Sequence, residues 1–176
     1  IHARHGRNWL MAGNMEGSIY HYGMAHRLNP QSQRISSNLA LSHFNIAAQL
    51  NSNTNQTAAL FHYRAGLKYQ PKNQTARNNL AWILATSAEE TIRNPKEAIK
   101  IANQLNQDTG NKIPQVLDTL AASQAANGEF QMAVITIKKA ISILSPKSDT
   151  TLLKSLQQRL SLYNIQKIYT EKGSKD

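Results

Sequence analysis

The chain has 176 residues, 40% of them hydrophobic, and a formal net charge of +10 at pH 7. A chain of this length can bury one modest core or a series of smaller ones. Having no cysteine, it contains no disulfide framework, thiol nucleophile or Cys-ligated zinc site. No apolar run approaches the ~20 residues of a membrane span, so we expect a soluble protein. No signal-like leader opens the chain, and because it begins at Ile1 rather than Met, we expect a fragment of a longer protein.

Positive charge is concentrated in the first half of the chain. Residues 1–77 contain eight lysines and arginines against one acid, Glu16, a net charge of +7. Residues 78–176 contain twelve against nine acids, a net charge of +3. An acidic partner would therefore prefer the first half. The alternative interpretation is a solvated surface whose net charge keeps copies of the protein apart.

Prolines divide the chain into helical segments. Apolar residues recur with the helical period between them, and no proline falls inside such a run, as expected for a residue that breaks helices. Because the β-branched residues also lie within these runs, we predict an all-α fold. The prolines are Pro30, Pro71, Pro95, Pro114 and Pro146.

The first predicted helix pair covers about residues 1–32 and has a copy near the end of the chain. Residues 8–32 align with residues 123–148 when Gly13 is matched to Gly128. Small residues then coincide at positions where helices must approach closely, and the proline turns fall within one residue of each other. In both stretches the glycine separates two apolar runs, which predicts a tight helical hairpin.

Two further helix pairs are predicted at about 33–73 and 74–110. The first of them has extra residues before and within the polar loop 51–57 and lacks a hairpin glycine. The second carries an inserted stretch, SAEETIRN, between its two helices. These loops are either decoration or carriers of a specific contact.

Local signals mark both ends of the helix that begins at Pro95. Asn94 is a predicted N-cap, followed by proline at the first helical position and by Glu97 three residues after the cap. Gly110 stands where this helix should stop.

The fourth predicted pair covers about residues 113–146, and a single capping helix follows at 149–169. This last helix has Ser148 or Asp149 as its predicted N-cap, and its apolar face would cover the open end of the stack. Residues 170–176 are expected to fray. The apolar face consists of Leu152, Leu156, Leu160 and Tyr163.

These features resemble the tetratricopeptide repeat (TPR) family over about residues 1–146. The family pattern has a small residue in the first helix, a hairpin glycine, small residues in the second helix and a proline at the exit. The resemblance implies a right-handed α-solenoid of about four helix-turn-helix repeats with a C-terminal capping helix, in one domain over 1–169. The matching residues are Gly6, Gly13, Ser18, Ile19, Ala25 and Pro30; Ala40, Ala59, Leu60 and Pro71; Ala81, Ala98 and Ile99; and Ala121, Gly128, Ala133, Val134 and Ala140.

In TPR proteins the first helix of each pair lines a concave groove, which implies a site here for an extended peptide or a partner helix. Family asparagines that contact peptide backbone match Asn38 and Asn79, and the equivalent positions hold Arg4 and Thr119. An amide side chain can pair with a peptide group of any sequence, and arginine adds a preference for carboxylates. The predicted groove residues are Arg4, Arg7, Arg34, Asn38, Leu41, Asn45, Asn78, Asn79 and Trp82.

Some of these assignments have a structural alternative. Asn38 and Asn79 can be helix caps, and Trp82 can be a core residue. Among the other aromatic residues, we assign Trp9, Tyr22 and Tyr63 to the core, since aromatic side chains at helical spacing usually pack.

The sequence disfavours catalysis and metal binding. All six histidines lie within the first 62 residues, and His2 and His5 have a chelating spacing, but no acidic residue precedes Glu16. Neither a glycine-rich phosphate loop nor a Ser-His-Asp context is present. We therefore predict a non-catalytic interaction scaffold with no cofactor, no metal site and no small-molecule substrate. Its expected partner is a protein or peptide, with acidic segments favoured by the arginines.

Binding of nucleic acid or another polyanion is the alternative function. The charge favours it, but the basic residues are scattered along the sequence and no nucleic-acid-binding motif emerges. A second resemblance concerns context, because residues 76–134 are similar to terminal repeats of large bacterial membrane proteins that also carry glycosyltransferase-like or sulfatase-like regions. It implies a C-terminal accessory module, on the extracytoplasmic side, that recruits a partner to a membrane-anchored parent chain.

Overall fold

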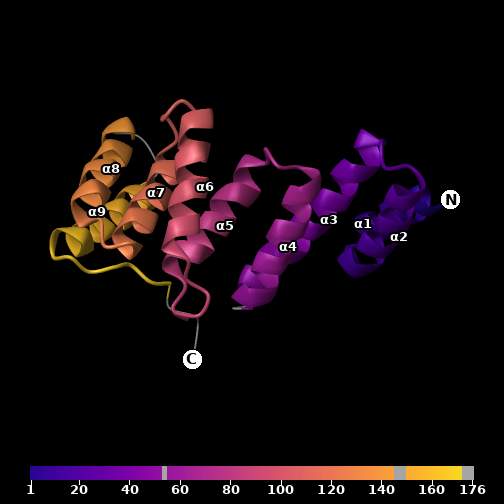
Figure 1. Cartoon of the computed structure of the whole chain (residues 1–176), viewed down its shortest axis with the longest axis horizontal. Coiled ribbons are helices and arrows are strands. Elements are labelled where there is room, and N and C mark those ends of the chain that lie inside the picture. The colour runs from indigo at the N-terminus through magenta and orange to yellow at the C-terminus, as the bar shows by residue number, and fades with distance from the viewer. Residues whose placement is uncertain (53–54, 145–149, 172–176) are drawn as a thin grey trace. The chain divides into compact units, whose positions relative to one another are not determined.

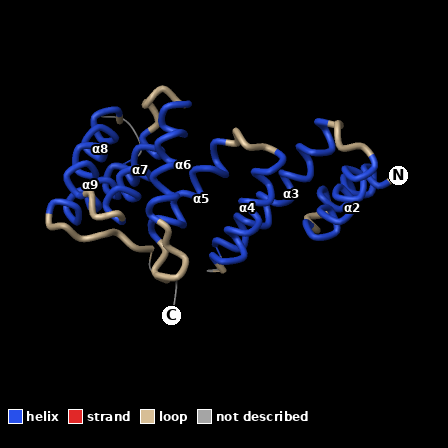
Figure 2. The backbone as a smooth tube through the Cα atoms, in the orientation of Figure 1, coloured by secondary structure: helices blue, strands red, loops and turns tan. Residues whose placement is uncertain are grey.

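The computed structural model describes residues 1–52, 55–144 and 150–171, and their regular structure is entirely helical (Figures 1 and 2). The all-α prediction is confirmed. Within the described residues, the single β-type contact is an isolated bridge between Ser87 and Glu171. None of the described helices has the length and apolar character needed to cross a membrane. The helices are α1 (His2–Met11), α2 (Met15–Leu28), α3 (Gln33–Ser52), α4 (Gln56–Tyr69), α5 (Gln74–Thr86), α6 (Pro95–Asp108), α7 (Pro114–Ala126), α8 (Phe130–Ile143) and α9 (Thr150–Asn164).

Glycines end helices where the sequence predicts it. Gly13 lies between α1 and α2 with a φ of 75°, and Gly128 lies between α7 and α8 with a φ of 84°. Gly110 follows α6 with a φ of 66°. These left-handed conformations cost glycine little because it has no Cβ, so the hairpins can be short.

Asparagine side chains cap the second helices of the first three pairs. The Oδ1 of Asn14 accepts a hydrogen bond from the Gly17 amide at 2.8 Å. Asn55 caps α4 in the same way. Asn94 caps α6 directly before Pro95, as predicted, and accepts from the Glu97 amide at 3.3 Å. Each cap satisfies a backbone donor that would otherwise lack a partner.

The small residues that match the TPR pattern are buried at helix contacts. Side chains of this size let the helix backbones approach each other closely. Their burial confirms that the small positions of the pattern are sites of close helix packing. Ser18 is also buried, and its hydroxyl is satisfied by the Gly6 carbonyl at 3.1 Å and the Ser42 hydroxyl at 2.7 Å. The buried small residues are Gly6, Ser18, Ala25, Ala40, Ala59, Ala81, Ala98, Ala121, Ala133 and Ala140.

Contacts divide the chain into two compact units, Ile1–Ala76 (unit 1) and Arg77–Asp176 (unit 2). In unit 1, Tyr22 packs with Ala25, Ile35 and Leu39. Tyr22 and Tyr63 are each 2% exposed, which confirms them as core residues.

Trp9 is not a core residue, contrary to the prediction. It lies in the last turn of α1, and its indole packs against Gly17 of α2 while 41% of the residue stays exposed. An aromatic residue at a helix end has helical spacing, yet neighbours cover only part of its ring.

The core of unit 2 is closed by α9. Leu156 and Tyr163 of α9 pack into one cluster with Leu117 of α7 and Ile137 of α8. The described part of the chain thus confirms α9 as the capping helix. Its predicted caps, Ser148 and Asp149, lie outside the described residues.

The capping helix is shorter than predicted, because α9 ends at Asn164 rather than at Tyr169. Gln166 adopts a left-handed φ of 55°, and the Lys167 amide donates to the Leu162 carbonyl at 2.9 Å. The left-handed residue turns the chain away from the helix axis, and the bond closes this turn, which ends the helix. Of the tail expected to fray, Thr170 and Glu171 are placed and half-buried, and residues 172–176 lie outside the described residues.

Both unusual stretches between paired helices have a structural role. Most of the extra residues before α4 extend α3 to 20 residues. In the SAEETIRN stretch, Arg93 donates to the Ser87 carbonyl at 2.8 Å and pairs with Glu90 at 3.0 Å. The loop is therefore held by its own polar contacts.

Candidate functional site

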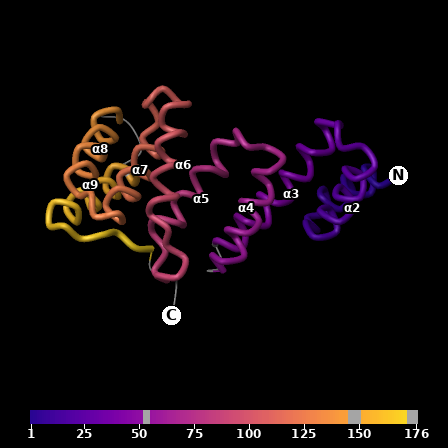
Figure 3. The backbone as a smooth tube through the Cα atoms, in the orientation of Figure 1, coloured from indigo at the N-terminus to yellow at the C-terminus, as the bar shows by residue number. Residues whose placement is uncertain are grey.

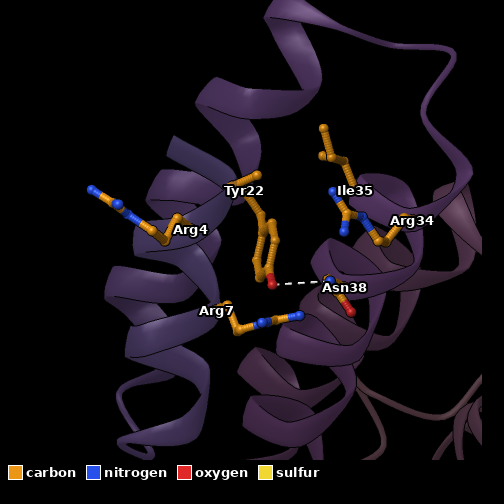
Figure 4. Close-up of a pocket in the computed structure, with 7 residues that line it drawn as sticks. Arg4, Arg7, Tyr22, Arg34, Ile35 and Asn38 are labelled. Atoms are coloured by element: carbon orange, nitrogen blue, oxygen red, sulfur yellow. Dashed lines mark hydrogen bonds between the residues drawn. The ribbon is translucent and has the colours of Figure 1, made fainter. Parts of the chain in front are cut away.

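A cavity of about 170 Å³ lies in unit 1 between α1, α2 and α3. Figure 4 shows Arg7 of α1 and both Arg34 and Asn38 of α3 pointing toward Tyr22. The lining residues are Ala3, Arg4, Arg7, Tyr22, Arg34, Ile35 and Asn38. Four of the nine predicted groove residues thus meet around one cavity.

Tyr22 forms the back of this cavity and organises it. Its ring packs against Gly6, where an added Cβ would lie 2.9 Å from two ring atoms. At the other end, the Asn38 amide donates to the Tyr22 hydroxyl at 2.9 Å. Burial raises the pKa of the Tyr22 phenol further above neutral pH, and its oxygen accepts this bond as a neutral hydroxyl. The contact holds Asn38 in one orientation.

Arginines surround the Tyr22–Asn38 hydrogen bond. Arg7 reaches from α1 beneath the Tyr22 hydroxyl, and Arg34 approaches from the α3 side, while Arg4 points away from the bond (Figure 4). All three arginines are exposed. No acidic residue lines the cavity, and Glu16 is the one acid in the sequence of unit 1. The arrangement therefore favours an anionic group that guanidinium groups can bind through two parallel hydrogen bonds.

The other predicted groove residues lie elsewhere. In unit 1, Leu41 is exposed farther along α3, and the Asn45 amide is 3.7 Å from the Met15 sulfur. Neither residue lines the cavity. In unit 2, Asn78 and Asn79 lie within α5 and are half-buried, and the Asn78 Oδ1 is buried with no hydrogen-bond partner among the described residues.

Asn38 and Asn79 lie inside α3 and α5 rather than at helix ends, so neither is a cap. Thr119, the equivalent in the fourth repeat, is buried and donates to the Gln115 carbonyl at 3.1 Å. The four equivalent groove positions therefore do not all present accessible polar groups, because Thr119 is buried.

The Trp82 side chain is half-buried, and neighbouring side chains of unit 2 contact it. Its Nε1 donates to Glu171 at 2.7 Å, and the Arg159 guanidinium lies 5.2 Å from its ring. Arg159 also makes two hydrogen bonds to Asp118, at 2.7 and 2.6 Å, and both residues are buried. Sequence reasoning missed this cluster because its members are far apart in the chain and follow no local period.

Histidines pair across both hairpins of unit 1. The Nδ1 atoms of His2 and His21 lie 3.2 Å apart, and those of His43 and His62 lie 3.0 Å apart. Burial lowers the pKa of His43 to about 4 and also lowers that of His62. No group of three or more potential metal ligands occurs among the residues that the structure describes.

A sequence signal for these pairs exists but was missed. The offset of 41 residues between His21 and His62 also separates His2 from His43, Tyr22 from Tyr63, Asn14 from Asn55, and Pro30 from Pro71. Adjacent hairpins of unit 1 are therefore copies of one pattern, which matching the first hairpin to the last did not reveal.

Comparison with known proteins supports the fold. Several solved structures match, and among them the TPR domain of P58(IPK) matches with a TM-score of 0.51 over 94% of this chain. The fold is a TPR-type helical repeat. The sequences are 12% identical, and the chain spans 55% of that domain, about half its length. No protein-family model matches the sequence, and no curated protein matches it.

Proposed function

We propose that the chain is a non-catalytic scaffold for protein interactions, which binds an acidic segment of a partner protein at the arginine-lined cavity of unit 1. The observation that carries the proposal is the arrangement of Arg7 and Arg34 around the Tyr22–Asn38 bond, with no acidic residue in the lining. TPR-type repeats commonly present such inner surfaces to protein partners.

The cavity is suited to a carboxylate group. Its volume of about 170 Å³ admits a side-chain or terminal carboxylate but not a folded domain. Guanidinium groups supply paired donors, and the fixed Asn38 amide adds a neutral polar contact beside them. Because Tyr22 is packed and hydrogen-bonded, the site is formed before the ligand arrives, which lowers the entropic cost of binding.

The proposal can be tested with a fluorescein-labelled peptide of alternating glutamate and glycine, EGEGEGE, and its glutamine counterpart, QGQGQGQ. We expect the full chain to bind the first peptide and not the second, as measured by fluorescence anisotropy. Arg7→Gln and Arg34→Gln should each weaken binding by about tenfold, the effect of losing one charge-assisted contact. Arg27→Gln is the matched control, because Arg27 is exposed in the same unit but lies outside the cavity.

The control also separates the proposal from general polyanion binding. If Arg27→Gln weakens peptide binding as much as Arg7→Gln does, net charge rather than the cavity drives the interaction, and the proposal is wrong. In that case the same variants should weaken binding of a 15-nucleotide oligothymidine in parallel, with a steep dependence on salt concentration.

The setting of the scaffold is a further part of the proposal. We infer from the resemblance of residues 76–134 alone that the repeats form a C-terminal accessory module of a membrane-anchored parent on its extracytoplasmic side. Under this inference, unit 1 recruits a partner or substrate to the parent. Sequencing the gene decides the matter, since a reading frame without a membrane or catalytic region would defeat it.

A further inference from the structure

The C-terminal segment of unit 2 returns to α5 after α9 ends. After the turn at Ile165 and Gln166, the tube in Figure 3 shows the chain leaving α9 and running to the end of α5. There the Glu171 amide donates to the Thr86 carbonyl at 2.8 Å, next to the bridge with Ser87. The segment pairs with the chain much as an added peptide strand would.

Side chains reinforce this backbone contact. The Glu171 carboxylate accepts the Trp82 indole hydrogen bond at 2.7 Å, and the Tyr169 ring lies 5.0 Å from the Arg159 guanidinium. The same guanidinium also lies 5.2 Å from the Trp82 ring, whose centroid is 5.9 Å from that of Tyr169, and it is oriented by Asp118. An acid and an aromatic ring two positions apart thus supply the side-chain contacts.

The receiving groups are preformed on packed elements. Trp82 and Thr86 belong to α5, while Arg159 is held by α9 and by its two bonds to Asp118 of α7. The arriving segment is less firmly held. Residues 165–168 are exposed, and residues 169–171 are only half-buried. A segment with few buried contacts opens at a lower free energy than the helices beneath it.

We propose that the face formed by Trp82, Thr86 and Arg159 is a second peptide-binding site, which residues 168–171 of the chain itself occupy in cis. A partner segment with an aromatic residue two positions before a carboxylate binds there when the cis segment leaves. This inference goes beyond the proposed function, because it concerns unit 2 and does not depend on the arginine-lined cavity.

The cis arrangement predicts how a competing peptide behaves. A tethered segment has an effective concentration of about millimolar, so it outcompetes a micromolar peptide of the same sequence. Weakening the tethered copy should therefore reveal binding in trans. The probe is a fluorescein-labelled peptide with the sequence of residues 164–171, NIQKIYTE.

The first experiment compares full-length variants by fluorescence anisotropy. We expect the double variant Tyr169→Ala/Glu171→Ala to bind NIQKIYTE at least tenfold more tightly than the native chain does. Lys167→Ala, in the same segment but exposed, should behave like the native chain. The peptide NIQKIATA should not bind the double variant. A folded double variant that binds no tighter than the native chain, or binds both peptides equally, overturns the proposal.

A second measurement needs no substitution and remains decisive if the double variant does not fold. In the native chain, the Glu171 amide should exchange with solvent at least a hundredfold faster than amides in the middle of α5, because only local opening is required. Exchange of Glu171 at the same rate as α5 would show that the segment is a permanent part of the fold, and the proposal would fail.

Discussion

His43 makes the stability of unit 1 sensitive to acid. It is 8% exposed, its ring faces His62, and burial lowers its pKa to about 4. In the unfolded chain a histidine titrates near 6.5, so protons bind the unfolded state first as the pH falls. The stability is complete above about pH 6.5 and decreases as the pH falls towards 4, by up to about 3 kcal/mol from His43.

This dependence can be measured by urea unfolding at pH 7, 6, 5 and 4, followed by circular dichroism. We expect His43→Gln to lower the slope of unfolding free energy against pH, since Gln does not titrate. The pKa of His62 is also lowered by burial, with Glu16 opposing the shift, so part of the slope should remain. A variant slope as steep as the native one would contradict this assignment.

A second residue-scale prediction concerns the Asp118–Arg159 pair, whose members are 5% and 6% exposed. Asp118→Asn leaves a buried guanidinium without its countercharge, and we expect a loss of about 3–5 kcal/mol in urea unfolding. Replacing both residues, as Asp118→Leu/Arg159→Met, should restore most of that loss because it also removes the uncompensated charge. A double variant as unstable as Asp118→Asn would show that the packing around the pair, rather than its charge balance, sets the cost.

At the scale of the helix, close approach decides which glycines can be replaced. An alanine Cβ at Gly6 would lie 2.9 Å from the ring of Tyr22, which cannot move away because it is buried and bonded to Asn38. We expect Gly6→Ala to lower the unfolding free energy by about 1–2 kcal/mol. Gly23→Ala is the control: nothing lies within 4 Å of its added Cβ, so it should stabilise α2 by about 0.5–1 kcal/mol. Equal effects of the two substitutions in urea unfolding would rule out a steric role for Gly6.

Helix limits and small buried positions could be predicted from the sequence because they depend on local sterics. Pro95 starts α6, Gly128 separates α7 from α8, and Ala121 is buried where a larger side chain would push the helices apart. The end of α9 was harder to predict. It depends on a reversal at Gln166, a residue with no marked preference for the left-handed conformation.

The candidate site was partly predictable for a related reason. Arg7, Arg34 and Asn38 follow from their places along repeated helices, so the sequence pattern brings them together. The contact between Trp82 and Glu171 joins residues 89 positions apart, and no periodicity links them. Contacts of that kind arise from the path of the folded chain and leave no local signal.

At the scale of the whole molecule, the two units should respond separately to local damage. Repeat proteins transmit destabilisation mainly between neighbouring repeats. We expect Gly6→Ala to reduce amide protection against hydrogen exchange within Ile1–Ala76 while leaving α7, α8 and α9 unchanged. Equal loss of protection in both units would show that the chain unfolds as one cooperative body.

The offset of 41 residues in unit 1 has a consequence for protein engineering. Each copy has its own capping asparagine, buried tyrosine, histidine pair and closing proline, so the instructions for one hairpin are contained in one block of sequence. Such a block can be duplicated as a single unit. Inserting an additional copy of residues 31–71 after Pro71 should lengthen the array by one hairpin and leave the existing hairpins folded.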